Sequence, residues 1–185
     1  MSRCRSALGL LALLAIAGCQ QMPVRDASAA PPVTDCSVAA TAPAAEAFYR
    51  QVVELNPRGL PSMTELRTLG PLMSFGLQAS IERARARQQA MMMARPQDKP
   101  DFIEGSLFTS LFEGPTSVVA ATPADAVQPA LVAVSLEYTQ GETVRWQDRL
   151  LLLCEGGRWR VDDVRFGGDW DFANRGSLRQ ALDAE

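Results

Sequence analysis

The chain has 185 residues, a length that suits one domain of ordinary size. It carries 18 basic and 21 acidic side chains and a formal net charge of −3, which argues against nucleic acid as a partner. The sequence has no histidine, which excludes Ser-His-Asp and Cys-His catalytic groups and nearly all zinc sites. We find no reaction motif in the sequence and expect neither a bound metal nor a cofactor.

The first predicted element is an export signal. Arg3 and Arg5 precede an uninterrupted apolar run over residues 7–17, which is too short to span a bilayer, since that takes about 20 residues. Ile16-Ala17-Gly18-Cys19 then resembles the lipobox of bacterial lipoproteins, in which the cysteine thiol receives a diacylglyceryl group and the chain is cut before it. The resemblance implies that residues 1–18 are removed and that Cys19 carries a lipid anchor with palmitate among its acyl chains. An ordinary secretory signal that is cleaved elsewhere is the alternative.

The anchor would set the location of the domain. Each buried methylene contributes about 0.8 kcal/mol, and the two or three acyl chains of such lipoproteins give stable membrane attachment. Gln20 stands where an aspartate favours retention in the inner membrane of enteric bacteria, so the resemblance points to the outer membrane, facing the periplasm. Residues 19–42, rich in Ala, Pro, Thr and Ser, are expected to form a flexible tether, with ordering that begins near Cys36 or just beyond it, and residues 43–185 a single domain.

The cysteines predict a disulfide. Cys4 leaves with the signal and Cys19 is committed to lipid, so Cys36 and Cys154 remain as a pair in a compartment that oxidises thiols. Two unpaired thiols are the alternative, because a sequence does not give the distance between them.

Apolar residues at helical spacing predict three helices near the start of the domain. The first covers residues 43–55, with Phe48 and Val52 on its apolar face. The second begins at Ser62, which has the capping-box spacing to Glu65, and stops at Gly70-Pro71. The third runs from Pro71 to about Ala94, and three of its arginines are expected to form a solvated face: Arg83, Arg85 and Arg87. Contact of these arginines with anionic lipid or glycan is the alternative.

Residues 98–116 are expected to form a structured loop whose aromatic side chains are pinned against the core. These side chains are Phe102, Phe108 and Phe112. Glu104 and Glu113 lie in the same loop and could act as an acid/base pair, since two carboxylates suffice for glycoside hydrolysis. Turn or cap roles beside the neighbouring glycines are the favoured interpretation.

From residue 116 the apolar period changes to two, which predicts an antiparallel meander. Strands are expected over 116–122, 132–138, 144–152 and 159–166, with turns at residues 140–142 and at Gly156-Gly157. Asp148 interrupts the apolar face of the third strand. Asp162-Asp163 indicate a bulge in the fourth strand, or a strand covered on both faces. A short helix over residues 176–182 follows, so the fold class is α+β, with N-terminal helices packed on the meander.

Several stretches together are similar to bacterial lipoproteins with the domain of unknown function 3828. They are Phe48-Tyr49, residues 104–108, residues 112–115, Trp159-Arg160-Val161-Asp162-Asp163-Val164, and Ser177-Leu178-Arg179 with Leu182. The resemblance implies a cone like that of nuclear transport factor 2, with helices packed on a curved sheet. It implies no established activity, so it assigns no catalytic residue.

Two other groups of residues could form sites. Asp162, Asp163, Asp169 and Asp171 could converge on calcium, but their spacing matches no EF-hand loop. We favour partnership with arginines of neighbouring strands, namely Arg145, Arg149, Arg158 and Arg160. Candidates for lining a pocket between sheet and helices are Phe108, Tyr138, Trp146 and Trp159, with simple core filling as the alternative.

We therefore expect a periplasm-facing lipoprotein that is not an enzyme and that binds a protein partner or a small ligand. One alternative is an inhibitor or immunity-type protein, whose acidic balance would suit a basic secreted enzyme or toxin. The other is an envelope hydrolase that uses Glu104 and Glu113.

Overall fold

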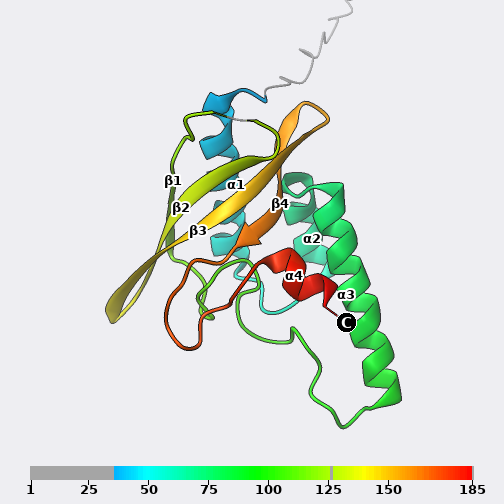
Figure 1. The fold of residues 1–185 in the computed structure, drawn as a ribbon. Helices are drawn as coiled ribbons and strands as arrows, with labels where there is room; N and C mark the ends of the chain where they lie inside the picture. Colours follow the sequence, from blue (N-terminus) through cyan, green and yellow to red (C-terminus); the bar gives the residue numbers. More distant parts are fainter. Residues whose placement is uncertain (1–35, 126, 185) are drawn as a thin grey trace, which may run out of the picture. The chain divides into compact units, whose positions relative to one another are not determined.

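The computed structural model describes residues 36–125 and 127–184, in which helices come first and an antiparallel sheet follows (Figure 1). The predicted α+β class is confirmed. The lipobox and Cys19 lie outside the described residues. The elements are η1 (Val38–Ala40), α1 (Thr41–Leu55), α2 (Met63–Leu69), η2 (Gly70–Leu72), α3 (Phe75–Ala94), β1 (Ser117–Ala120), β2 (Ala130–Gln140), β3 (Glu142–Glu155), β4 (Arg158–Arg165) and α4 (Leu178–Asp183).

The sheet is a meander, as predicted. In the described residues its strand order is β1-β2-β3-β4, and each strand is antiparallel to the next. β2 and β3 turn at Gly141, whose φ of 93° suits glycine. The register pairs Val134 with Asp148 and Leu136 with Trp146, so these four side chains share one face of the sheet. All four are buried, which puts a carboxylate among the core positions.

The predicted bulge is present in β4. Leu151 pairs with Asp163 and Leu152 pairs with Val161, which leaves Asp162 as the extra residue. Because of this extra residue, Val161 and Val164 both reach the core although they are three positions apart.

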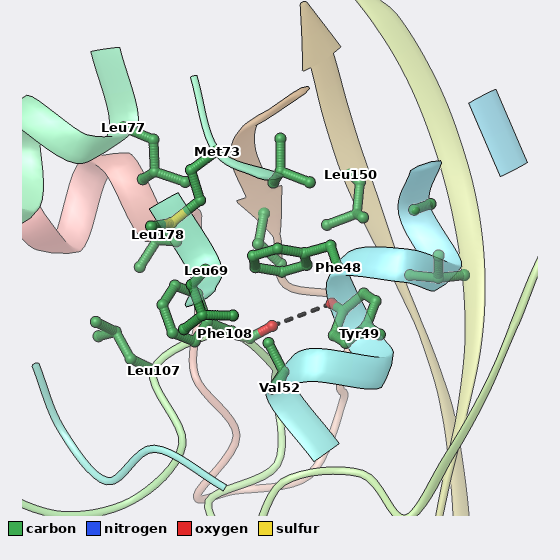
Figure 2. Packing of buried hydrophobic residues seen from close by; sticks show 14 of the residues in the cluster. Phe48, Tyr49, Val52, Leu69, Met73, Leu77, Leu107, Phe108, Leu150 and Leu178 are labelled. Atoms are coloured by element: carbon green, nitrogen blue, oxygen red, sulfur yellow. Dashed lines mark hydrogen bonds between the residues drawn. The ribbon is translucent and has the colours of Figure 1, made fainter. Parts of the chain in front are cut away.

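The core forms where α1 lies along one face of the sheet (Figure 1). Phe48 is fully buried and packs edge-on against Tyr49 and Phe108, with ring centroids 5.5 and 5.4 Å away (Figure 2). The Tyr49 hydroxyl donates a hydrogen bond of 3.0 Å to the Phe108 carbonyl oxygen. Helix α1 and the loop that carries Phe108 are thereby joined inside the core.

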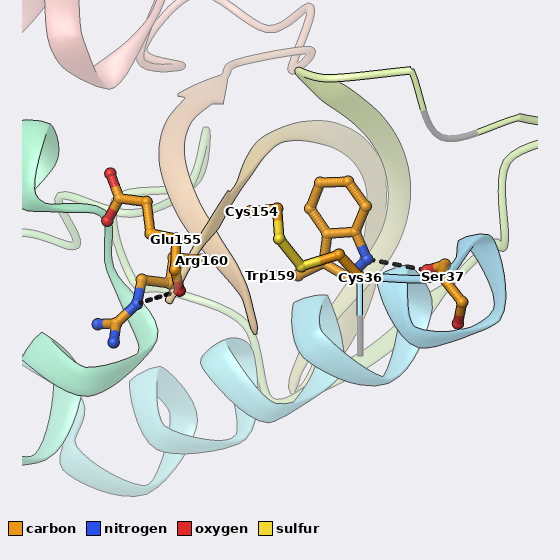
Figure 3. Close-up of a disulfide and its surroundings, with 6 residues drawn as sticks. All are labelled: Cys36, Ser37, Cys154, Glu155, Trp159 and Arg160. Atoms are coloured by element: carbon orange, nitrogen blue, oxygen red, sulfur yellow. Dashed lines mark hydrogen bonds between the residues drawn. A yellow bond between two sulfur atoms is a disulfide. The ribbon is translucent and has the colours of Figure 1, made fainter. Parts of the chain in front are cut away.

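The Cys36–Cys154 disulfide joins the start of the described chain to β3, with Cα atoms 5.9 Å apart (Figure 3). Beside it the Trp159 indole donates to the Ser37 carbonyl oxygen at 2.8 Å. The predicted pairing is therefore present. Order begins at Cys36, near the position predicted, so residues 36–42 at the end of the predicted tether lie in the segment that the disulfide holds, in η1 and in the first turn of α1.

The third helix begins four residues later than predicted. Gly70–Leu72 forms a separate 3₁₀ turn, and Met73 is extended and bridges to Val161 of β4. Ser74 then caps α3: its side chain accepts from Leu77 N at 2.9 Å, and its backbone N–H donates to the Val161 carbonyl at 2.8 Å. Pairing with β4 thus interrupts the helix that the apolar spacing suggested.

Arg83 and Arg87 of α3 are exposed, as predicted, and Arg85 is half-buried, but each of the three also contacts another segment. Arg83 pairs with Asp183 of α4 at 2.8 Å. Arg85 donates to the Pro61 carbonyl oxygen, and Arg87 donates to the Leu182 carbonyl oxygen. All three fasten α3 to other segments. Across residues 36–125 and 127–184, none of the helices has the length and apolar character needed to cross a bilayer.

Candidate functional site

Asp148 is the only fully buried charged side chain in the described part of the chain. It lies on β3 between Trp146 and Leu150, in the phase that faces the core. We predicted only that it interrupts an apolar face. The sequence signal was nevertheless present, because a carboxylate at an inward position of an amphipathic strand needs buried hydrogen-bond donors.

Five donors converge on the Asp148 carboxylate. Oδ2 accepts from Trp146 Nε1 at 3.1 Å, from Thr109 Oγ1 at 3.1 Å and from Ser110 N at 3.0 Å. Oδ1 accepts from the Ser110 hydroxyl and from Gly167 N at 2.9 Å. Both oxygens are thus engaged, which offsets the cost of burying the charge. The carboxylate joins β3 to the loop of residues 98–116 and to the segment that follows β4.

That segment, residues 167–176, is here called the 167–176 loop; it is the orange-red connection between β4 and α4 in Figure 1. Gly167 N and Gly168 N donate to Ser110 Oγ at 3.0 and 2.9 Å. At its far end Asn174 N donates to the Ser110 carbonyl at 2.9 Å, and Asn174 Nδ2 donates to the Thr109 carbonyl at 2.6 Å. Both ends of the loop are therefore fixed to Ser110, the first through its hydroxyl and the last through its carbonyl.

The middle of the loop is also held. Arg175 donates to the carbonyl oxygens of Gly168 and Trp170 at 3.1 and 2.7 Å. The Trp170 ring packs edge-on against Trp146, with centroids 6.0 Å apart. Phe172 lies beyond these contacts and is 92% exposed. The result is a surface aromatic side chain on a loop with internally paired backbone.

Tyr49 lies in the core near this carboxylate. Burial raises the pKa of its hydroxyl well above the ordinary value of 10.0, and the negative charge of Asp148 raises it further. Tyr49 therefore stays neutral near pH 7 and remains a hydrogen-bond donor to Phe108.

The four candidates for lining a pocket occupy different places. Phe108 is fully buried against Phe48, and Trp159 is buried beside the disulfide. Tyr138 lines a cleft of about 280 Å³ together with polar side chains, namely Asn56, Arg58, Glu113 and Gln140. Trp146 borders a separate, open cleft over β1, β2 and β3. A ligand pocket at these residues stays a prediction.

The loop of residues 98–116 is structured, as expected, but one of its aromatic residues is not in the core. Phe108 is fully buried and Phe102 packs against the core cluster, whereas Phe112 is 47% exposed. The Arg58 guanidinium lies over the Phe112 ring, 5.6 Å from its centroid. Ser106 N donates to the Phe112 carbonyl at 2.7 Å, which fixes the backbone there while the ring lies at the surface.

Glu104 and Glu113 have different surroundings. Glu104 pairs with Lys99, whose hydrogen bond and charge lower the pKa of this exposed carboxyl. Glu113 is exposed beside the Tyr138 cleft, and its backbone carbonyl accepts from Arg58 at 3.1 Å. The neighbouring Gly105 and Gly114 have φ values of 77° and 84°, as turns that need glycine do. Acid/base work by the two carboxylates remains an untested prediction.

The aspartates near the C-terminus pair differently from our expectation. Asp162 accepts from Ser74 and pairs with Arg179 of α4 at 3.1 Å, and Asp163 accepts from Arg179 N at 2.9 Å. The predicted strand arginines are not their partners; these carboxylates instead contact the cap of α3 and the start of α4. Asp169 and Asp171 are exposed in the 167–176 loop. Within the described ranges, no group of three or more Cys, Asp or Glu side chains is placed to hold a metal ion.

Comparison with known proteins adds one partial similarity. The chain is 36% identical over 52 residues to the uncharacterised lipoprotein YbjP of Escherichia coli strain K12. The match covers 28% of this chain and 30% of the relative, so the chain spans less than a third of the length of the curated relative it matches. No family model matches the chain, and no solved structure matches it.

Proposed function

We propose that the chain is a lipoprotein of the cell envelope, anchored through Cys19, with its folded domain in the periplasm. Three observations support this proposal: the lipobox at residues 16–19, the partial similarity to a protein named as a lipoprotein, and a disulfide that suits an oxidising compartment. Gln20 favours the outer membrane. Kinship with the domain-of-unknown-function 3828 lipoproteins, and a cone like that of nuclear transport factor 2, belong to the same proposal.

The domain itself is proposed to bind a partner and to carry out no reaction. The observation that supports this part is the structural role of the buried Asp148 carboxylate. Its two oxygens accept hydrogen bonds from five donors, and these donors hold the base of an exposed loop. A general acid or base must exchange protons with a substrate, whereas this carboxylate is enclosed and serves to position backbone. Holding a surface loop rigid is what a binding module needs.

The anchor is tested by labelling cells with a palmitate analogue. The wild-type chain and a Cys4→Ala variant should both yield a labelled, membrane-bound product, because Cys4 lies in the segment that is removed. A Cys19→Ala variant should lose the label and leave the membrane fraction. If the wild-type product stays unlabelled and Cys19→Ala fractionates like it, the assignment to the lipoproteins is wrong.

A further inference from the structure

We propose that the 167–176 loop is a pre-formed protein-docking element. In this proposal Phe172 enters an apolar pocket of a periplasmic protein, and Asp169 and Asp171 face basic groups around that pocket. The inference rests on the proposed binding function and names the class of partner: a protein with an apolar pocket rimmed by lysine or arginine.

Phe172 differs from the other exposed phenylalanines of the described chain. Phe75 lies under the Arg160 guanidinium, 5.4 Å from the ring centroid, and Phe112 lies under Arg58. Phe172 is 92% exposed, the highest value among the large apolar side chains in the described residues. Full burial of such a ring removes a large apolar surface from water, which is what a central anchor of an interface does.

The loop is also ordered before any partner binds. Its first residues donate to Ser110 and Asp148, its last residues are fixed by Asn174, and Trp170 packs on Trp146 between them. Ordering a flexible loop on binding costs backbone conformational entropy at every residue that becomes fixed. Because the loop is already ordered in the free protein, binding would lose little further backbone entropy, and more of the contact energy at Phe172 would appear as affinity.

The charges of the loop select the kind of partner. Asp169 and Asp171 are exposed, and neither forms an ion pair with any described residue. The Arg175 guanidinium donates to carbonyl oxygens of the loop itself, so it is directed into the loop. Two free carboxylates beside an aromatic ring favour a basic protein surface and disfavour an anionic lipid surface.

Photocrosslinking in cells tests the contact. p-Benzoylphenylalanine is placed at Phe172 of the full lipidated chain, and at Phe75 as the matched control, because Phe75 is exposed but covered by Arg160. We expect one discrete adduct with a different protein from position 172 and none from position 75. With the partner purified, Phe172→Ala should weaken binding at least about 30-fold, and Phe75→Ala less than about threefold. The double variant Asp169→Lys, Asp171→Lys should slow association at least about tenfold at low salt.

Four results would overturn the proposal: an adduct with a second copy of this chain, an adduct with lipid alone, no adduct from a natively folded and lipidated chain, or binding that Phe172→Ala leaves intact. In the last case the binding function stands and only the assignment of the loop is lost. Failure of palmitate labelling would instead remove the proposed envelope function. Phe172→Ala is expected to fold, since its ring is 92% exposed, and near-ultraviolet circular dichroism checks this.

Discussion

Replacing Asp148 with asparagine tests whether the buried carboxylate holds the structure together. The amide offers one acceptor oxygen to a site with five donors. If the oxygen takes the Oδ2 position, Trp146, Thr109 and Ser110 N keep an acceptor but lose the charge. The amide nitrogen then faces Gly167 N–H, another donor. Each hydrogen bond that loses its charged acceptor weakens by about 1 kcal/mol. Gly167 N–H loses the carboxylate but still donates to Ser110 Oγ at 3.0 Å, so this loss adds only about 1 kcal/mol. The total is partly offset because no charge is buried.

We therefore expect Asp148→Asn to lower the free energy of unfolding by about 3 kcal/mol. Urea unfolding of the mature chain in detergent, followed by tryptophan fluorescence, measures the change. Asp169→Asn is the matched control, because it makes the same chemical change on the exposed loop and should cost less than about 0.5 kcal/mol. If Asp148→Asn unfolded within about 0.5 kcal/mol of the wild type and kept its near-ultraviolet spectrum, the carboxylate would not be the anchor that we describe.

Four further changes probe other parts of the structure. The pair Cys36→Ser and Cys154→Ser should cost about 4–5 kcal/mol in urea unfolding, because the bond closes a loop with a sequence separation of 118; two free thiols in the native secreted protein would contradict it. Above about pH 10 the unfolded Tyr49 ionises but the folded one, with its raised pKa, does not, so the wild type loses stability as the pH rises. Tyr49→Phe should remove this loss, and the slopes of unfolding free energy against pH should differ by up to about 1.4 kcal/mol per pH unit. Parallel curves of unfolding free energy against pH for the two proteins would refute it. Gly167→Ala should cost more than about 2 kcal/mol in thermal unfolding, since its Cβ would overlap a backbone carbonyl oxygen of β3, and an unchanged melting temperature would show that the strand can give way. Ser62→Ala should cost about 1 kcal/mol by removing the observed capping box; an unchanged urea midpoint would mean that the cap contributes nothing.

Local patterns predicted the parts of the fold that depend on local physics. The capping box at Ser62, the turn at Gly141 and the extra residue in β4 each follow from residues next to one another in the sequence. The meander follows from alternation, because a strand with one buried face repeats every two residues. These features needed no knowledge of what packs against them.

The errors share one cause, which is a partner far away in the sequence. Helix α3 starts late because Met73 pairs with Val161. Arg83 holds Asp183 of α4, a residue that the helical pattern alone does not bring near it. Asp148 looked like an interruption because its donors come from residues 109–110 and 167. Side-chain partners at such separations depend on the tertiary arrangement, which periodicity does not specify.

Asp148 also bears on why this end of the sheet is built as it is. Trp146 and Leu150 flank it on the same buried face, and an apolar residue there would avoid a desolvation cost of several kcal/mol. Apolar packing, however, would leave the N–H groups of Ser110 and Gly167 without this acceptor. The carboxylate fixes two loops to one strand at defined hydrogen-bond distances, which apolar contacts do not do because they are not directional. A charge at this position is therefore better explained by the loop geometry that it fixes than by the stability of the core.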